Sequence, residues 1–218
     1  RSLVGSEMCI RDRAEEGIPA YSVSREGYFE TYEVSVLLDY LKVLDNARQD
    51  LPLTAVLTSP FAGLTAAELS VIRLAYPNQL FYEAVEGFCS LSSEEILETV
   101  DKKQAIQVQE KLRKFFEVLD HFREILPYTA IHDLLVEIID KTGYGLFISA
   151  MPGGAQRQAN VEMLVEKARA FEGTSYKGLF NFVRYIEQLK KYDVDYGEAS
   201  IIDEQDDTCL LYTSDAAD

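Results

Sequence analysis

Apolar residues at helical spacing are the feature of this sequence that most restricts its fold. Between residues 32 and 44, apolar side chains recur at positions i, i+3, i+4 and i+7. A half-buried strand would show alternate apolar residues instead. The spacing therefore predicts an amphipathic helix with one buried face. The residues of that face are Val34, Leu37, Leu38, Leu41 and Leu44.

Capping signals divide the rest of the sequence into further helices. Residues 65–68 have the Thr-x-x-Glu pattern of a capping box, and residues 92–95 repeat it with Ser and Glu. The second box predicts a long helix or helix pair that ends before Pro127. Later helices are expected at 129–142, 154–172 and 175–192, with Gly173 as a C-terminal cap. Residues 17–23 predict a short strand, residues 51–60 form a second apolar stretch, and the chain is expected to be mainly α-helical.

Composition restricts the classes of function. The chain has 218 residues and a net charge of −16, which argues against a free-standing, non-specific nucleic-acid binder. Any DNA contact must be local or supplied by other parts of a larger protein. No apolar run is long enough for a membrane span, so no membrane partner is expected. Cys9, Cys89 and Cys209 lack metal-ligand spacing, so we expect a cytoplasmic protein with neither disulfide nor zinc.

The two ends differ from the sequence between them. Residues 1–13 and 209–218 resemble translated sequencing-adapter read-through, so we expect neither segment to be native. Cys89 would then be the only native thiol.

Catalytic groups are not expected in this chain. Gly153 and Gly154 lack the following Lys of a phosphate-binding loop, so they predict a helix-breaking turn. His121 and His132 lie on different predicted helices without a nearby nucleophile, and the acidic pairs are typical of solvated helix starts. We therefore predict no catalytic residue and no metal ligand.

Two segments have features of binding sites. In Thr58–Thr65, a Gly turn leads into a capped helix, which would present free backbone N–H groups to a phosphate. The alternative is an ordinary turn and cap. Arg157 and Asn160 are spaced i, i+3 and share a helix face. They would either anchor a neighbouring loop or contact a ligand.

These segments, in this order, resemble the C-terminal region of UvrD-like helicases, and most closely the AddA family of ATP-dependent helicase/nuclease subunits. Residues 17–21 resemble the family's GIPY strand, and residues 27–33 its F-x-E-x-x-E element. Residues 46–60 are similar to the pattern DN-x-x-QD-I-P-L-x-x-V-L-R-S-P. Residues 143–144 and 151–160 resemble the TGY and GG-x-QR-x-AN-L signatures. The resemblance covers residues 14–208.

The resemblance implies a domain organisation. Such helicases have two RecA-like α/β motor lobes and a helical accessory domain, called 2B, inserted in the second lobe. Residues 27–203 would be the 2B-like domain. Residues 14–26 and 204–208 would be short flanking pieces of the motor lobe.

It also implies a function for the parent protein. That function is an ATP-dependent 3′-to-5′ DNA helicase, with a possible exonuclease, in double-strand-break repair and recombination. ATP and Mg²⁺ would be cofactors of the parent, and this fragment would bind neither and be inactive alone. The implied partners are DNA at a single-strand/duplex junction and a second, AddB-type helicase/nuclease subunit. The alternative is an α-helical protein-interaction module without DNA binding.

Finally, the resemblance implies site residues. In UvrD-type relatives, the turn after T-P-x-R-G-I-G contacts duplex DNA, which assigns DNA contact here to Ser59, Gly63, Leu64 and Thr65. Ala62 replaces the Arg of that pattern, which weakens the expected contact. The residues expected in a structural or coupling motif are Glu33, Gln49, Asp50, Arg157 and Asn160.

Overall fold

A computed structural model describes residues 20–22, 27–91, 102–174, 177–191 and 209–211 of the chain. The described part is mainly helical, as predicted, with two three-residue strands. None of its helices is both long and apolar enough to cross a membrane. Its elements, in chain order, are β1 (Ala20–Ser22), η1 (Tyr28–Glu30), α2 (Tyr32–Asp45), α3 (Asp50–Thr58), α4 (Ala66–Ala75), α5 (Phe81–Ser90), α6 (Lys102–Ile125), η2 (Leu126–Tyr128), α7 (Ile131–Lys141), α8 (Tyr144–Ser149), α9 (Gly154–Glu172), α10 (Leu179–Lys191) and β2 (Cys209–Leu211).

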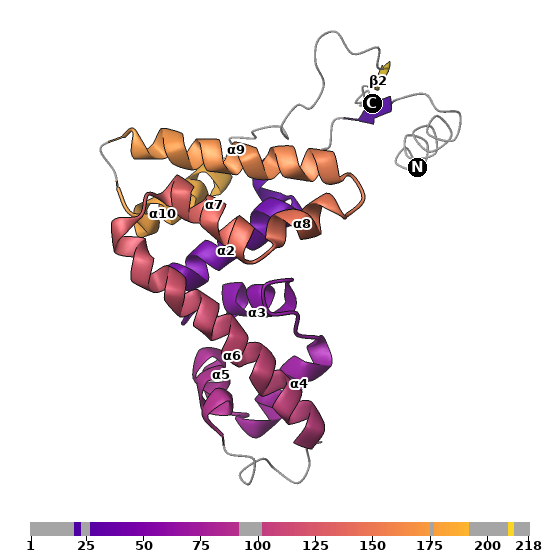
Figure 1. Cartoon of the computed structure of the whole chain (residues 1–218), viewed down its shortest axis with the longest axis vertical. Coiled ribbons are helices and arrows are strands. Elements are labelled where there is room, and N and C mark those ends of the chain that lie inside the picture. Colours follow the sequence, from indigo (N-terminus) through magenta and orange to yellow (C-terminus); the bar gives the residue numbers. More distant parts are fainter. Residues whose placement is uncertain (1–19, 23–26, 92–101, 175–176, 192–208, 212–218) are drawn as a thin grey trace, which may run out of the picture.

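Helix α2 lies at the centre of the helical body (Figure 1). It packs against α3, α6, α9 and α10. The five apolar residues of the predicted face are all buried, but so are Val36, Tyr40 and Val43 on the other sides. The expectation of one buried face is therefore wrong, because neighbouring helices cover α2 from several directions.

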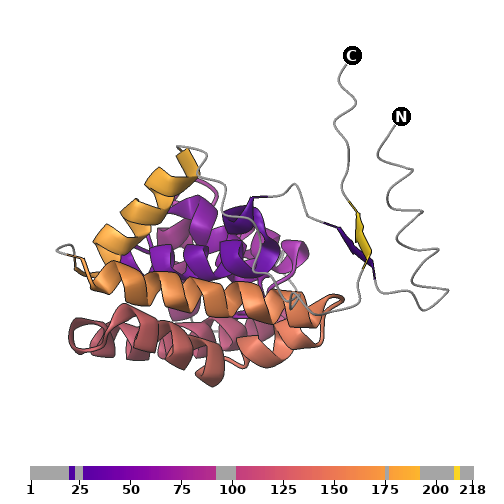
Figure 2. The ribbon, with the colours of Figure 1, turned by 90° about the horizontal axis from the view of Figure 1, so that it is seen from above.

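Helix α9 packs against α7, α8 and α2, and Figure 2 shows these helices side by side. A second group of helices, α4 and α5, packs on the first half of α6 (Figure 1). Because α6 also contacts α2, this long helix joins the two groups. Its buried residues keep the helical spacing, with Ala105, Val108, Leu112, Phe115 and Leu119 on one side.

The two strands pair in parallel, with Ala20 opposite Cys209 and Ser22 opposite Leu211. Strand β1 lies inside the segment predicted as a strand. The second apolar stretch, residues 51–60, forms most of α3 and its C-terminal turn.

Several helix boundaries differ from those predicted. Helix α7 begins at Ile131, because Thr129 is extended and its hydroxyl bonds back to the Ile125 carbonyl. The short helix α8 was not predicted. Gly173 caps α9 with φ −69°, so it adopts a right-handed conformation open to any residue. The second predicted capping box and residues 1–13 lie outside the described residues.

Candidate nucleic-acid interface

The turn after α3 contains the residues expected to contact DNA. Ser59 is buried, and its hydroxyl donates to the Val56 carbonyl (2.6 Å). The amides of Ala62 and Gly63 both donate to the Ser59 carbonyl, at 3.3 and 2.8 Å, and the Leu64 amide donates to Leu57 (2.9 Å). Gly63 has φ +63°, a left-handed conformation that favours glycine.

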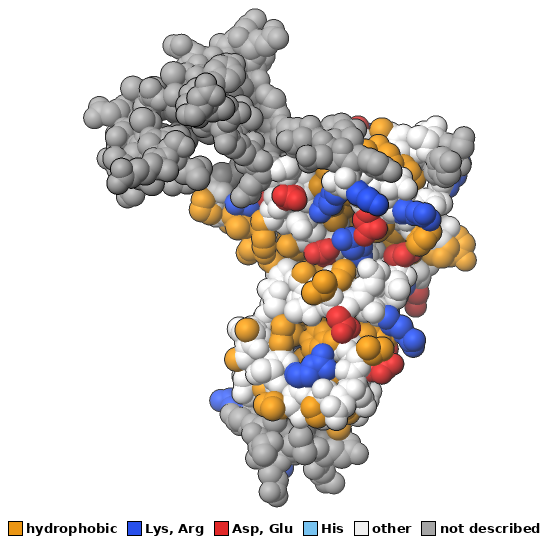
Figure 3. Space-filling view, turned by 180° about the vertical axis from the view of Figure 1, so that it is seen from behind, with side chains coloured by type: hydrophobic (Ala, Val, Ile, Leu, Met, Phe, Trp, Pro, Cys, Tyr) orange, Lys and Arg blue, Asp and Glu red, His pale blue; other side chains and the backbone are white. Residues whose placement is uncertain are grey.

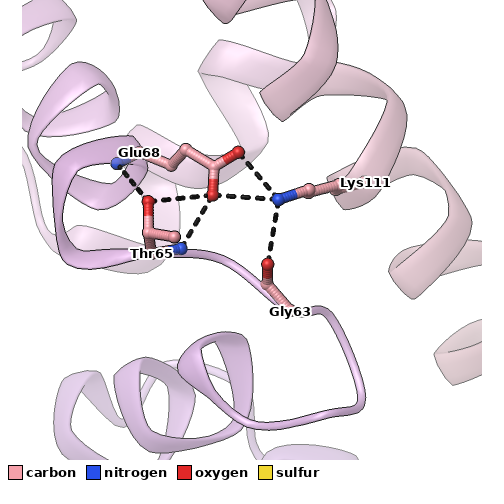
Figure 4. Close-up of polar contacts among 4 residues, drawn as sticks. All are labelled: Gly63, Thr65, Glu68 and Lys111. Carbon is pink, nitrogen blue, oxygen red and sulfur yellow. Dashed lines mark hydrogen bonds and ion pairs between the residues drawn. The ribbon is translucent and has the colours of Figure 1, made fainter.

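A capping box starts α4 immediately after this turn, as predicted. The Thr65 amide donates to Glu68 Oε2 (2.7 Å), and the Glu68 amide donates to Thr65 Oγ1 (3.2 Å). Lys111 of α6 contacts both the turn and the capping box (Figure 4). Its Nζ donates to the Gly63 carbonyl (2.9 Å) and forms an ion pair with Glu68 Oε1 (2.8 Å). Burial raises the pKa of Glu68, but the bonds from Lys111 and Thr65 outweigh it, so the pKa is lowered.

This geometry corrects the expected mechanism of phosphate binding. The amides of Gly63, Leu64 and Thr65 are already donating within the protein. The Glu68 carboxylate lies at the start of α4, where a bound phosphate would need to lie. The free-amide mechanism is therefore wrong for these three residues, because an internal anion satisfies the helix terminus.

Positive charge gathers along the first half of α6, which reaches the turn at Lys111. The first half of α6 carries Lys102, Lys103, Lys111, Arg113 and Lys114, with Glu110 as its one acidic residue up to position 116. The described side chains include 17 Lys or Arg and 19 Asp or Glu, so most of the chain's excess negative charge lies elsewhere. On the face turned away from the viewer of Figure 1, basic and acidic side chains are interspersed (Figure 3).

The structure brings Glu33, Arg157 and Asn160 together although Glu33 is more than 120 residues from the other two in the sequence. Glu33 lies in the first turn of α2 and is 2% exposed. Its carboxylate accepts from Arg157 Nη1 (2.5 Å) and from Asn160 Nδ2 (2.7 Å), both in the first half of α9. The shared face of Arg157 and Asn160 therefore contacts a neighbouring helix.

Two buried tyrosines extend this cluster. The hydroxyl of Tyr144 donates to the Glu33 carbonyl (3.0 Å), and that of Tyr28 donates to the Asn160 carbonyl (2.7 Å). Burial raises the pKa of both tyrosines, so both hydroxyls stay protonated as donors. A polar cavity of about 230 Å³ adjoins the cluster and is lined in part by Arg157 and Pro152.

Gln49 and Asp50 lie apart from this cluster, at the start of α3. Gln49 is the N-terminal cap residue of that helix, and its Nε2 donates to the Asn46 carbonyl (3.5 Å). Asp50 lines a groove of about 310 Å³ together with Leu51 and Arg73. The five residues expected in a structural or coupling motif thus occupy two separate places in the structure.

Further contacts in the described part, made by Lys111, Tyr144 and Glu172, were not predicted from the sequence. Lys111 holds the Gly63 turn, Tyr144 holds α2, and Glu172 at the end of α9 bonds both the Ile131 amide (2.6 Å) and the His132 ring. Each contact joins positions at least 40 residues apart, which residue spacing does not reveal. No group of three or more His, Cys, Asp or Glu side chains in the described residues is arranged to hold a metal ion.

Comparison with known proteins finds relatives that are named helicase/nuclease subunits. No family model matches it. The AddA subunit of the ATP-dependent helicase/nuclease of Lachnoclostridium phytofermentans is 40% identical over 90% of the chain and 17% of its own length. The proteins of the same name from Oceanobacillus iheyensis and Bacillus licheniformis are 38% and 39% identical over 98% of the chain and 16% of their own length.

The chain thus spans about a sixth of the length of these relatives. The resemblance seen in the short motifs is confirmed, and over nearly its whole length the chain is homologous to one segment of the AddA family of ATP-dependent helicase/nuclease subunits.

Proposed function

We propose that this chain is the helical accessory domain of an ATP-dependent DNA helicase/nuclease. The observation that carries the proposal is its homology, over 90–98% of its length, to one segment of the AddA helicase/nuclease proteins. By the motif resemblance, the parent is a 3′-to-5′ helicase in double-strand-break repair. The domain is of the 2B type and is inserted in the second RecA-like lobe.

ATP and Mg²⁺ would bind elsewhere in such a parent. Among the described residues there is no acidic cluster suited to Mg²⁺, and the sequence has no Gly-Lys-Ser/Thr loop for the phosphates. We therefore expect this chain alone to show no DNA-stimulated ATP hydrolysis above background. Measurable hydrolysis by the purified chain would contradict the assignment.

The proposed DNA contact is the Gly63 turn together with the first half of α6. Lys111 joins the two, since its Nζ bonds the Gly63 carbonyl. Because Glu68 neutralises Lys111, the cations offered to phosphates are Lys102, Arg113 and Lys114, all exposed on α6. Ser59, Gly63, Leu64 and Thr65 would then shape the surface that approaches the DNA, while α6 supplies the charge.

A salt titration with a tailed duplex tests this contact. Binding through about three phosphates should weaken steeply as salt rises, and Lys102→Ala with Lys114→Ala should lower the slope by about two. Gly63→Ala should weaken binding because it strains a left-handed residue of the turn. Gly143→Ala is the matched control, since Gly143 has φ +70° and open space around it but lies between α7 and α8.

A second candidate function is docking of a protein partner, such as the second helicase/nuclease subunit. The groove beside Asp50 favours it. Leu51 on its rim is 86% exposed, and the Arg73 guanidinium lies 5.2 Å from the Phe81 ring at its floor. Such a mixed apolar and cationic surface is typical of protein interfaces. Retained affinity for the partner protein without DNA binding at any salt would favour this function, and loss of that affinity in Leu51→Asp would locate it.

A further inference from the structure

Helix α10 exposes aromatic and basic side chains beside and beyond the face that it buries. It buries Leu179, Phe182 and Ile186 against the body. Phe180 and Tyr185 are 58% and 37% exposed. Residues 177–191 also carry four Lys or Arg side chains and one acidic residue, in a chain whose net charge is −16.

A pocket of about 310 Å³ opens between this helix and the end of α9. Phe171 of α9 forms its floor, and the Tyr185 ring lies 5.2 Å from the Phe171 ring, tilted by 31°. Arg184 supplies a guanidinium to the lining. The amide side chains of Asn181 and Gln188 complete it.

These groups match the chemistry of an unpaired nucleotide. An exposed aromatic ring offers a stacking surface to any base, and amide side chains can donate to and accept from base edges. The Nδ2 of Asn181 donates to the Lys177 carbonyl (2.8 Å), and its Oδ1 is the acceptor of this amide. A guanidinium one residue from the stacking ring can pair with the adjacent phosphate.

We propose that the α10 pocket binds one unpaired nucleotide of a single nucleic-acid strand. The base stacks on Tyr185, and Arg184 holds the neighbouring phosphate. The inference rests on the proposed function in one respect, since both require a nucleic-acid partner. It differs in ligand and place, because the Gly63 turn and α6 would contact duplex while this pocket would contact a single strand.

Fluorescence anisotropy on the complete 218-residue chain tests the proposal with two labelled probes, a thymidine oligonucleotide and a blunt duplex of equal length. Losing one stacked base costs about 1–3 kcal/mol, or roughly 5- to 150-fold in affinity. Tyr185→Ser should weaken oligonucleotide binding within that range, and Arg184→Gln should weaken it and reduce its salt dependence. Tyr185→Phe should retain binding, because the ring remains.

Two control variants separate local from general effects. Tyr128→Ser removes a tyrosine that is 90% exposed on η2, and Arg169→Gln removes an exposed guanidinium on α9. Neither should change oligonucleotide binding. Circular dichroism of each variant checks that the helical content is retained.

The outcomes for the two sites are distinguishable. Unchanged oligonucleotide affinity in Tyr185→Ser and Arg184→Gln, or an equal loss of affinity in Tyr128→Ser, would overturn the proposal that the pocket binds a nucleotide. The duplex measurement tests the Gly63 and α6 contact independently. If the unchanged chain binds the oligonucleotide but not the duplex, only the proposed contact of the Gly63 turn and α6 with duplex is overturned. Competition by free thymidine monophosphate at the same concentration as the oligonucleotide would assign the pocket to free nucleotides and overturn the strand proposal.

Discussion

Replacing Arg157 with Met tests whether its ion pair with Glu33 stabilises the contact between α2 and α9. The substitution keeps most of the apolar stem but removes the guanidinium that pairs with Glu33. Among the described residues, the Glu33 carboxylate, 2% exposed, would keep the amide of Asn160 as its one side-chain donor. An uncompensated buried charge is the consequence.

The expected loss of stability follows from the burial of the two partners. Breaking a buried ion pair from one side costs about 3–5 kcal/mol. The Arg157 side chain is 26% exposed and adjoins a polar cavity of about 230 Å³, so water can reach the carboxylate. We therefore expect the low end, about 3 kcal/mol, or a fall in Tm of about 6–12 °C for a chain of this size. Glu33→Gln should cost less, about 1 kcal/mol, because a neutral amide can still accept from Arg157.

Urea denaturation followed by circular dichroism at 222 nm measures these differences, and the double variant is the decisive sample. If the two groups interact, Glu33→Gln with Arg157→Met should be at least about 1 kcal/mol more stable than the sum of the single losses predicts. If the loss in the double variant equals the sum of the two single losses within about 0.5 kcal/mol, the ion pair does not stabilise the contact.

Three further substitutions probe other contacts by the same measurement. Glu172→Gln tests a carboxyl whose pKa is raised by burial and lowered by more through the bonds from His132 and the Ile131 amide. Because the pKa is lowered, the carboxylate stabilises the fold fully above the ordinary value of 4.5 and less as the pH falls. The variant should therefore lose stability fully above about pH 5 and less below it, and a loss independent of pH would contradict this. Lys111→Met should cost about 1 kcal/mol by releasing the Gly63 carbonyl and Glu68, whereas Lys114→Met, on the exposed side of α6, should cost almost nothing. Gly154→Ala should cost about 2 kcal/mol or more, because its Cβ would lie 2.2 Å from the Ser149 carbonyl oxygen. Gly173→Ala is the control and should be tolerated, because its Cβ would lie 3.3 Å from the Ala170 carbonyl oxygen. Equal losses of stability would show that the turn between α8 and α9 shifts to make room for the Cβ.

Local signals in the sequence predicted local structure well. The spacing of apolar residues placed α2, and the Thr65 and Glu68 pair placed the start of α4, because both signals act within one or two turns of helix. The shared face of Arg157 and Asn160 was predicted for the same reason. Helix α8 was missed because its six residues are too few to show a period.

What the sequence could not predict depends on distant partners. Glu33 resembles an ordinary acidic residue in a first helical turn, and only its contact with Arg157, 124 residues away, makes it a buried ion. The amides of the Gly63 turn were expected to be free, since a helix start leaves donors unpaired unless the fold supplies acceptors. The fold supplies Glu68 and adds Lys111, which lies 48 residues from Gly63.

The central position of α2 has a consequence for synthesis. Within this chain α2 is synthesised well before α9, and its Glu33 bonds Asn160 across 127 residues. At about 5–20 residues per second, that delay is roughly 6–25 s, during which the apolar sides of α2 lack their final cover. The nascent domain therefore depends on α3 and α6 to shield α2, and a ribosome that stalls before α9 leaves an aggregation-prone intermediate.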